Sequence, residues 1–545
     1  MQLPPIDLDT ISDPAARAII GQLLHVIETL AAENAALRVE NQQLRDENAR
    51  LQGGSGKPDI RPPVARPATD HSSETERRVR TPRGKRRTIT TRPVTRIVRC
   101  TVDPARLPPG AVRHGTVTRH VQELTLTADT IRFVRDIWRD PATGTTITAP
   151  LPPGYHGAFG PQLRALTLAL GHGANVSQPA LLTFLTDAGI AIGAGTLARW
   201  LADAGGQWQI EARAIHHAGL ASGSWQATDM TGTRVDGQNH TCHVLGNACF
   251  SSYHTRPGGT RQDVLAVLWG QEPVFRLDDD ALLWLAATTC PQSIVTRLQA
   301  ALPWATDLTA AALATHLATA GLTLPPDPQR QVHDALAICA YHAQTTVPIV
   351  RTLLTDDAAV YHPITDVHAL CWVHAGRHLA KLAPVVPQHQ ALLVTVRTTF
   401  WALYHDLRAY RMAPTAAAVA TLRARFTDLV TQRTGYRALD DRLARFATNG
   451  VLLLAVLTQP DLPLHTNDME LAARRRVRKR DVSFGPQSAA GATAWDTFQT
   501  ISATATKLGV RLLGYLRDRM IAPETTPSMA AIIAERSRAP QPLLT

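Results

Sequence analysis

Leucine recurs every seven residues near the start of the chain, in the most regular hydrophobic pattern of the sequence. The leucines are Leu23, Leu30, Leu37, Leu44 and Leu51. The positions three residues before them hold Ile20, Ile27, Asn34, Asn41 and Asn48. Leucine at heptad position d, with isoleucine or asparagine at position a, is typical of a parallel two-stranded coiled coil. We therefore predict a coiled coil over residues 12–52 that makes the protein a homodimer or higher oligomer. An amphipathic helix packed on its own domain is the alternative, but it would have to explain the recurring asparagines.

Residues 53–100 are predicted to form a flexible basic linker. Proline and polar residues dominate its first part, and such a composition cannot form a core. The later segment "TPRGKRR" contains basic residues that suit the negative potential of a DNA minor groove. These residues are Arg83, Lys85, Arg86 and Arg87. The alternative is a solvated linker that binds any polyanion weakly.

Two small modules are predicted next. Short alternating stretches such as "VQELTLT" and "TIRFVRDIW", with "PATGTT" as a turn, indicate a β module over residues 101–160. Within residues 161–210, "SQPALLTFLTDAGIAIGAGTLARWLADAG" predicts a helix ending near Ala188, a bend, and a second helix opened by Thr196. This spacing is typical of a helix-turn-helix, in which Thr196 and Arg199 would face DNA. A plain helical hairpin explains the pattern equally well.

Acidic residues follow the hydrophobic pattern at three later places. The stretch "GSWQATDMTGTRVDG" predicts a strand with Ala227 and Asp229 on one face. "HTCHVLGNACF" is also strand-like, and "DVLAVLWG" is so less clearly. "VPIVRTLLTDDAAVY" predicts a strand that runs into Asp356 and Asp357, and "NDMELAARRRVRKRD" predicts a helix with Glu470 in its first turn.

Each of these acids has an ordinary structural explanation. Asp229 could accept backbone hydrogen bonds at a strand end, and Asp356 or Asp357 could cap the following turn. Glu470 could complete a capping box with Asn467 as the N-cap. Taken together, three acids could instead hold two divalent ions about 4 Å apart, the arrangement that acts on phosphodiesters. We therefore expect two Mg²⁺ or Mn²⁺ ions at these side chains.

The same segments resemble the signature blocks of the bacterial insertion-sequence transposases of family sixty-six. The blocks are "ATDMTGTRV", "LLTDDAAVYHPITDVHALCWVHAGRH" and "NDMELAARRRVRKRDVSFG", followed by "TISATATKLGV". The resemblance implies a DDE catalytic core of ribonuclease H-like fold, with Asp229, Asp356 and Glu470 as catalytic residues and metal ligands. It also implies DNA as the partner, both at the element ends and at the target.

The chain departs from this family pattern in three respects. Met230 stands where a glutamate is usual, and Leu471 where an arginine is usual. The family's cysteine-rich zinc module lacks its ligands, because Cys100 is alone in that region, so we predict no zinc. Cys371 and His374 lie one helical turn apart and could bind a metal only with two further ligands. We interpret both, together with the capping Asn467, as structural.

Positive charge points to a polyanionic partner. The formal charge is +11 and the sequence pI is about 9.7, and nucleic acid is commoner than membrane among the partners of such proteins. We expect the basic side chains that follow Glu470 to neutralise DNA phosphates. These are Arg474, Arg475, Arg476, Arg478, Lys479 and Arg480.

We expect a bacterial cytoplasmic, nucleoid-associated protein. Six cysteines lack paired spacing, and the chain opens without a charged-then-apolar leader. No apolar run reaches the roughly 18 residues of a membrane span.

The predicted fold class is an α/β catalytic core, a mixed sheet flanked by helices, with large helical insertions. An N-terminal coiled coil and small helical and β modules for DNA binding precede this core. The core is expected in three parts (211–270, 346–385 and 461–520), separated by helical insertions (271–345 and 386–460) and followed by a tail (521–545).

The predicted function is that of a DNA transposase, which cuts element ends and joins the 3′ hydroxyl to target DNA. Accessory transposition proteins could assist it. The alternatives are a catalytically inactive dimeric DNA-binding protein and a metal-dependent DNA nuclease without strand transfer.

Overall fold

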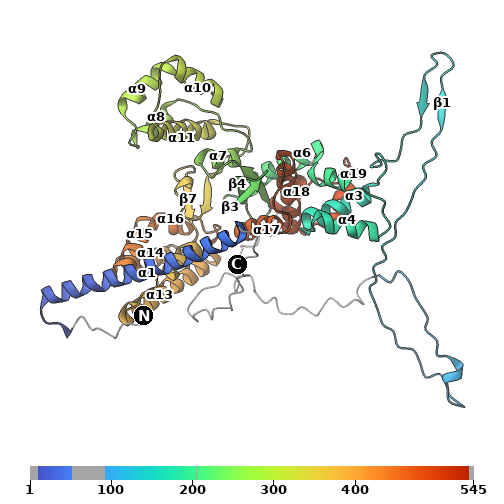
Figure 1. Ribbon diagram of the computed structural model, residues 1–545, viewed down its shortest axis with the longest axis horizontal. Coiled ribbons are helices and arrows are strands. Elements are labelled where there is room, and N and C mark those ends of the chain that lie inside the picture. Colours follow the sequence, from blue (N-terminus) through green and yellow to red (C-terminus); the bar gives the residue numbers. More distant parts are fainter. Residues whose placement is uncertain (1–9, 52–92, 204, 539–545) are drawn as a thin grey trace.

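A five-stranded mixed β-sheet forms the core of the computed structural model, which describes residues 10–51, 93–203 and 205–538 (Figure 1). The strand order is β5-β4-β3-β6-β7, with β3, β4 and β5 antiparallel and with β6 and β7 parallel to β3. The strands are β3 (Gln226–Val235), β4 (Gln238–Gly246), β5 (Ser251–Arg256), β6 (Thr352–Thr355) and β7 (Val367–Leu370). The strands predicted around Asp229 and before Asp356 are thereby confirmed.

The turn between β3 and β4 follows from its sequence. Asp236 and Gly237 have φ of 49° and 71°, and Val235 pairs with Gln238. Asp-Gly suits such a two-residue hairpin, because both central residues need positive φ. The turn sets the register of the two strands, and with it the face of the sheet on which Asp229 lies.

Helices cover both faces of this sheet. They are α17 (Asn467–Ser483), α18 (Ala489–Leu508), α7 (Arg261–Trp269) and α11 (Pro326–Ala343). On one face, Ala227 and Val244 share a buried cluster with Met469 of α17. On the other, Leu353 shares a buried cluster with Leu336 of α11. Alternate residues of each strand therefore face different helices, as the two-residue period requires.

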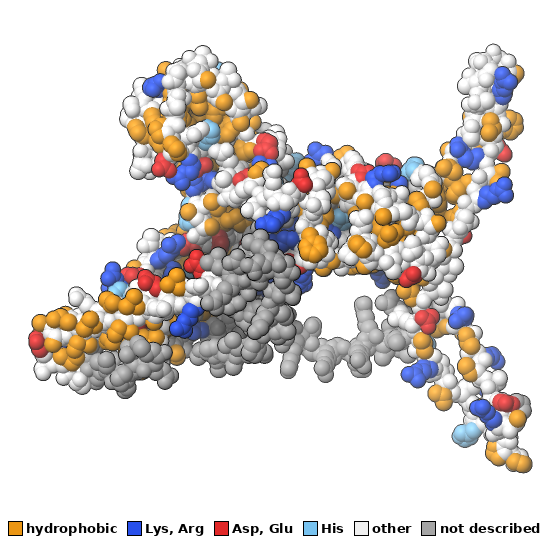
Figure 2. All heavy atoms as spheres, in the orientation of Figure 1, with side chains coloured by type: hydrophobic (Ala, Val, Ile, Leu, Met, Phe, Trp, Pro, Cys, Tyr) orange, Lys and Arg blue, Asp and Glu red, His pale blue; other side chains and the backbone are white. Residues whose placement is uncertain are grey.

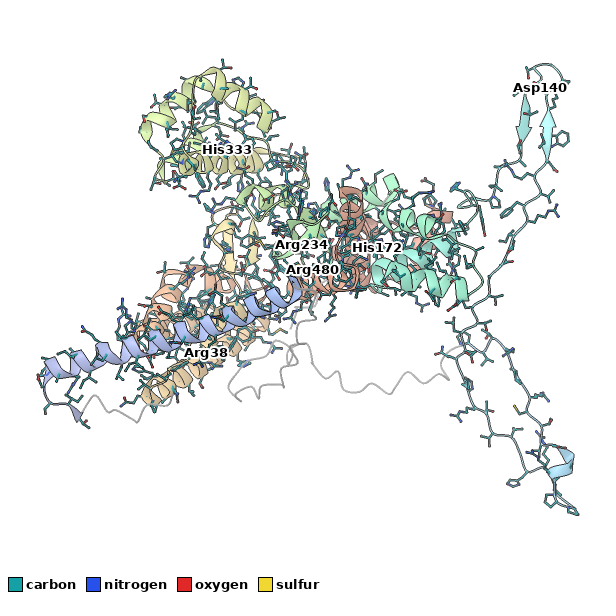
Figure 3. All side chains as sticks on the ribbon, in the orientation of Figure 1. Arg38, Asp140, His172, Arg234, His333 and Arg480 are labelled. Atoms are coloured by element: carbon teal, nitrogen blue, oxygen red, sulfur yellow. The ribbon has the colours of Figure 1, made fainter. Side chains whose placement is uncertain are left out.

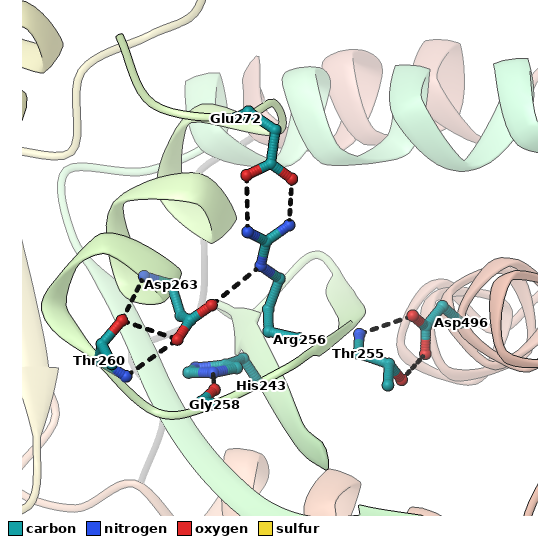
Figure 4. A network of polar contacts seen from close by, with 8 residues as sticks. All are labelled: His243, Thr255, Arg256, Gly258, Thr260, Asp263, Glu272 and Asp496. Carbon is teal, nitrogen blue, oxygen red and sulfur yellow. Dashed lines mark hydrogen bonds and ion pairs between the residues drawn. The ribbon is translucent and has the colours of Figure 1, made fainter. Parts of the chain in front are cut away.

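The strand-like segment "DVLAVLWG" is in fact the helix α7. A capping box opens it: Thr260 Oγ1 accepts from the Asp263 backbone N–H, and the Asp263 carboxylate accepts from that of Thr260 (Figure 4). Gly270, with φ of 76°, ends it. Residues 263–269 are all buried, and a short run buried all round cannot be assigned to helix or strand by periodicity.

Two groups of helices interrupt the core. The first holds α8 (Asp279–Ala286), α9 (Gln292–Ala301), α10 (Ala310–Thr319) and α11. The second follows β7 and α12 (Trp372–Ala380) and holds α13 (Pro387–Met412), α14 (Ala416–Val430), α15 (Arg437–Thr448) and α16 (Gly450–Leu453). Trp372 is fully buried among the aromatic rings of this second group, and its indole N–H donates to the Leu453 carbonyl at 2.7 Å. It therefore anchors the start of α12.

A helical module precedes the sheet. It consists of α3 (Pro161–Leu168), the π-helical turn η4 (Ala169–Gly173), α4 (Gln178–Asp187), α5 (Ala194–Ala202) and α6 (Gly205–Ala221). The helix pair expected around Ala188 is confirmed, with Leu185 and Leu197 in one buried cluster. The second helix begins at Ala194 and not at Thr196, with Gly193 as its N-cap. Figure 3 places His172 of η4 beside α18, and its ring stacks on Phe498 at 4.7 Å between centroids.

The last helices of the described chain pack back onto this module. They are α19 (Leu512–Ile521) and α20 (Met529–Arg538). Met529 and Ile533 are fully buried. Much of the segment expected as a tail is therefore a packed helix.

Residues 93–150 form an extended arm that projects from the body (Figure 1). Its hairpin joins β1 (Ile137–Arg139) to β2 (Thr146–Thr148), so the turn expected at "PATGTT" is confirmed. The segment "VQELTLT" forms no strand, because no described segment pairs with it. Figure 2 shows hydrophobic and basic side chains exposed along the arm, and Trp138 is 72% exposed.

The heptad segment is one helix, α1 (Pro14–Leu51), which lies along the second helical group (Figure 1). Leu24 and Glu28 are buried against that group, and the Glu28 carboxylate accepts hydrogen bonds from the backbone N–H groups of Val385 and Val386. The d-position leucines that the structure describes, Leu23, Leu30 and Leu37, are exposed instead. The side chains of Leu44 and Leu51 lie outside the described part.

One described segment, Pro14–Asn34 of α1, is long and apolar enough to cross a membrane by length and composition. This is weak evidence, because core helices and signal sequences pass the same test. The buried carboxylate of Glu28 lies within this segment and caps another helix. No membrane protein is indicated.

Candidate active site

Asp229 lies in the middle of β3, on the face that α17 covers. Its neighbour on that face, Ala227, belongs to the buried cluster with Met469. Burial raises the pKa of Asp229 to about 6, against a hydrogen bond from the Met230 backbone N–H and the attraction of His374. The carboxylates of Glu470 and Asp356 add to the rise. Asp229 is therefore held close to two other acids.

Strand register places Asp356 beside Asp229. Ala227 pairs with Leu354 in the parallel ladder between β3 and β6. Asp229 lies two residues further along β3, and Asp356 directly follows Thr355, the last residue of β6. The Asp356 carboxylate accepts a hydrogen bond from the Ala358 backbone N–H at 3.2 Å.

Asp357 is engaged elsewhere. Its carboxylate accepts hydrogen bonds from Arg445 Nε at 2.7 Å and from Asn449 Nδ2 at 3.0 Å, both in the second helical group. Of the two adjacent aspartates, Asp356 is therefore the one available beside Asp229.

Glu470 enters the same site from the first turn of α17. Its two carboxylate oxygens lie 2.9 Å from the two terminal nitrogens of Arg377. Oε1 also lies 3.6 Å from His374 Nε2, and Oε2 lies 3.5 Å from Arg474. Burial opposes ionisation, but the hydrogen bond and charge of Arg377 dominate and lower the pKa of Glu470.

The expected capping box at Glu470 does not form. Thr466 is the N-cap of α17 and Asn467 is already helical. The backbone N–H groups of Met469 and Glu470 donate to the Thr466 carbonyl. The interpretation of Asn467 as the capping side chain is wrong, because its amide is buried one position inside the helix. Among the described residues, neither amide atom of Asn467 has a hydrogen-bond partner.

Cys371, His374 and Arg377 recur at a spacing of three along the start of α12, which places them on one side of the helix. Burial opposes ionisation of the Cys371 thiol, but its interaction with His374 lowers the pKa of Cys371 and raises that of His374. Arg377 Nη1 donates to His374 Nε2 at 3.0 Å. His374, expected as a structural residue, thus also lies against Glu470.

Arg377 is a site residue that the sequence patterns missed. The signal was its position three residues after His374, on the helix that starts directly at the end of β7. Tyr361, the last residue of the segment "VPIVRTLLTDDAAVY", is a second such residue. It is fully buried, and burial with the nearby charges of Asp356 and Asp229 raises its pKa. It therefore lies near both aspartates.

The donor set suits a hard divalent cation, because Mg²⁺ and Mn²⁺ prefer carboxylate oxygens. The mutual repulsion of Asp229, Asp356 and Glu470 is what such a cation would relieve. As the side chains stand, no group of three or more acidic, histidine or cysteine residues within the described chain is placed to hold a metal ion. Arg377 is paired with the Glu470 carboxylate, so this pair would have to separate before Glu470 could bind a metal ion.

Two basic residues of α17 are buried, which corrects their expected role in DNA contact. Arg476 is fully buried, forms an ion pair with Asp496 and lies over the ring of Trp495 at 5.5 Å. Lys479 donates to the Gly171 carbonyl at 2.6 Å. Burial and the charge of Arg476 lower the pKa of Lys479 to about 7. Both side chains hold α17 against its neighbours.

Asp496 shows how α18 and the sheet are joined. Its carboxylate accepts hydrogen bonds from the backbone N–H and the hydroxyl of Thr255 on β5, at 2.6 and 2.8 Å (Figure 4). Arg476 completes this junction from α17.

The other basic residues of α17 remain within reach of solvent. Arg474 and Arg478 are exposed, and Arg475 and Arg480 are partly so. Arg480 donates to the Gly232 carbonyl of β3 at 2.6 Å, and Figure 3 shows it beside Arg234.

The remaining residues that are expected to contact DNA belong to other segments of the chain. Thr196 and Arg199 sit on α5, with Arg199 exposed. The linker residues Arg83, Lys85, Arg86 and Arg87 lie outside the described residues.

The two departures from the family pattern differ in their surroundings. Met230 packs against the cluster on the far face of the sheet from Asp229. A glutamate there would meet apolar neighbours, so methionine changes packing and not the carboxylate site. Leu471 is partly buried beside Glu470.

A family model described as "Transposase IS66 family" matches residues 335–494, which include Asp356 and Glu470 but not Asp229. This places the protein in the class of DNA-acting transposases.

A relative supports the same assignment. The uncharacterized protein y4jO of Sinorhizobium fredii is 30% identical over 322 residues, which is 59% of this chain and 99% of that protein. No solved structure matches. The chain belongs to the IS66 family of transposases.

Proposed function

We propose that the protein is a DDE-type transposase, a metal-dependent polynucleotidyl transferase that cuts the ends of an insertion sequence and joins the 3′ hydroxyl to target DNA. The observation that carries this proposal is the strand register that sets Asp356 beside Asp229, with Glu470 brought in by α17. The mixed five-stranded sheet with helices on both faces supports a ribonuclease H-like core.

Asp229, Asp356 and Glu470 would hold two divalent ions. Bound Mg²⁺ or Mn²⁺ would supply activation of the attacking oxygen and stabilisation of the leaving oxygen at the phosphodiester. Arg377 orients Glu470, and His374 lies next to Arg377 beside the same carboxylate oxygen. Arg474 and Arg478, one and two turns after Glu470, would neutralise phosphates of the bound strand.

The exposed stripe on α1 supports dimer formation. Leu23, Leu30 and Leu37 lie away from the face that holds Leu24 and Glu28. One helix can therefore dock on its own chain and still present its d-position leucines to a second copy. On this proposal the protein acts as a homodimer or higher oligomer. DNA recognition falls to the helix pair α4–α5, with Thr196 and Arg199, and to the basic segments before it.

The proposal is tested with the full-length protein and a labelled duplex that carries the terminal inverted repeat of the DNA flanking the gene. With Mg²⁺, the wild type should release a 3′ hydroxyl and join it to a second duplex. Glu470→Gln should abolish both steps and leave binding of the duplex within about twofold. Asp468→Asn is the matched control, because Asp468 lies in the same helical turn but is half exposed.

The outcomes separate the alternatives. Cleavage without joining would favour a nuclease. Binding without cleavage would favour an inactive DNA-binding protein. Unimpaired cleavage by Glu470→Gln would remove Glu470 from the active site.

A further inference from the structure

A hollow lies between the catalytic core and the second helical group, next to the three carboxylates. The core contributes Asp357, Cys371 and His374 to its lining, and α15 contributes Arg442, Arg445 and Asn449. The α15 residues recur at spacings of three and four, so they share one face of that helix. His374 belongs both to this lining and to the surroundings of Glu470. The hollow is therefore adjacent to the candidate active site, with His374 between them.

The hollow carries an uncompensated positive charge. Asp357 is the acidic residue in its lining, and it is already engaged by Arg445 and Asn449. For Arg442, no hydrogen bond or ion pair is found among the described residues, and its Nε is buried without a partner. Burial, followed by the charge of Arg445, lowers the pKa of Arg442. The pKa of His378, which also lines the hollow, is lowered by burial and then by the charge of Arg442.

A buried guanidinium N–H without a partner costs free energy, because it has lost its hydrogen bond to water and has formed none within the protein. An oxyanion in the hollow would satisfy that N–H and offset the charge that Arg442 shares with its neighbours. Guanidinium groups bind phosphate oxygens through two parallel hydrogen bonds. From these contacts we infer that Arg442 and the hollow around it form a subsite for a backbone phosphate of DNA, separate from the three carboxylates.

The inference rests on the proposed function for its ligand, which is the strand that passes the carboxylates. Since His374 separates the hollow from Glu470, the phosphate bound by Arg442 belongs to a nucleotide near the scissile one. The second helical group would then contact the DNA through Arg442, in addition to interrupting the core. Arg442 acts as a binding and positioning residue.

The test measures binding of the terminal inverted-repeat duplex to full-length variants in EDTA, so that it does not depend on cleavage. Arg442→Gln should weaken binding by about five- to thirtyfold, and should reduce the slope of log affinity against log salt by about one. Arg437→Gln is the matched control, because Arg437 lies on the same helix but its side chain is 70% exposed. It forms an ion pair with the exposed Asp441 at 3.9 Å. It should change neither quantity by more than about twofold.

A second measurement identifies the phosphate. Neutral methylphosphonates are placed one at a time along both strands of the duplex. At one position near the cleavage site, the methylphosphonate should weaken DNA binding by the wild type. The same substitution in the DNA should not weaken binding by Arg442→Gln any further, because that variant already lacks the contact. Arg442→Lys keeps the charge without the two-pronged geometry, so it should keep the salt slope while losing part of the affinity. Because it retains the cation, it serves if Arg442→Gln unfolds.

The inference is overturned if Arg442→Gln matches the wild type in affinity and salt slope. It is equally overturned if both proteins respond alike to every methylphosphonate. Failure of the wild type to cleave would reject the transposase chemistry but would leave the binding result standing. Cleavage by the wild type with no effect of Arg442→Gln would reject the phosphate subsite alone.

Discussion

The two terminal nitrogens of Arg377 contact the two carboxylate oxygens of Glu470, each at 2.9 Å. The pair joins the first helix after β7 to the helix that carries the last acid of the candidate site. The contact between Nη2 and Oε2 is a hydrogen bond, whereas Nη1 donates to His374 Nε2 and forms only an ion pair with Oε1. A hydrogen bond between two charged groups is stronger than one between neutral groups. Arg377 therefore places a positive charge against one of the three carboxylates that are proposed to bind metal.

If Arg377 competes with metal for Glu470, its removal should tighten metal binding. Arg377→Gln should raise the affinity of the DNA-free protein for Mn²⁺ by about tenfold, because a hydrogen bond to a charged group contributes about 1.5–3 kcal/mol. Isothermal calorimetry with Mn²⁺ measures this. Arg474→Gln is the control, since Arg474 is half exposed and lies 3.5 Å from the carboxylate. An unchanged or weaker Mn²⁺ affinity in Arg377→Gln would show that the arginine does not block the metal.

Asp229 should destabilise the metal-free fold at neutral pH. Its pKa rises from 3.8 to about 6 on folding, so the folded state binds protons more tightly than the unfolded state. Stability that protonation provides at low pH is lost as the pH rises from about 4 to 6. Asp229→Asn should therefore raise the free energy of unfolding at pH 7 by about 1–3 kcal/mol.

Thermal unfolding at a series of pH values with EDTA measures this effect. The advantage of Asp229→Asn should be full above pH 6 and absent below about pH 4. Adding Mn²⁺ should reduce the advantage, because the ion stabilises the wild-type carboxylate. An asparagine variant that is less stable than the wild type at pH 7 would contradict the cause assigned to the pKa shift.

Arg476 and Arg478 should have opposite roles although both lie on α17. Removal of Arg476 leaves the Asp496 carboxylate without its buried partner, so Arg476→Gln should lower the free energy of unfolding by about 3–5 kcal/mol. Arg478 is exposed, so Arg478→Gln should change stability by less than about 0.5 kcal/mol.

DNA binding separates the two residues further. Arg478→Gln should reduce the salt slope of binding by about one, and Arg476→Gln should leave it unchanged in the folded fraction. Chemical denaturation and salt-dependent fluorescence anisotropy give the two quantities. A stable Arg476→Gln with weakened DNA binding would restore Arg476 to the DNA-contacting set.

The exposed leucine stripe of α1 should control the oligomeric state. Leu30→Lys puts a charge into the seam of the proposed coiled coil, so the variant should be monomeric at concentrations where the wild type is dimeric. Analytical ultracentrifugation distinguishes the two. Thr29→Lys, on an exposed side of the same helix outside the heptad seam, should leave the dimer intact. A dimeric Leu30→Lys would place the subunit contact elsewhere.

Local sequence was a good guide wherever a few adjacent residues decide the structure. The turn at "PATGTT", the strands that carry Asp229 and precede Asp356, and the helix pair around Ala188 all follow from hydrophobic period and turn residues. The expected capping by Asn467 was wrong by one position, because helix ends depend on backbone geometry at single residues. The segment of α7 was ambiguous, because burial on all sides removes the periodic signal.

Only the tertiary structure decided which of the identified residues meet. Asp229 and Asp356 are brought together by the pairing of Ala227 with Leu354, a contact between distant parts of the chain. The same holds for Arg377 and Glu470. Arg476 and Lys479 look like their exposed neighbours in sequence, and they differ only because α18 and η4 cover them. By itself the sequence determined the local elements and the types of chemical group present, because these depend on neighbours along the chain. Burial, charge pairing and the composition of the candidate site depend on neighbours in space, so they were decided by the packing of the whole molecule.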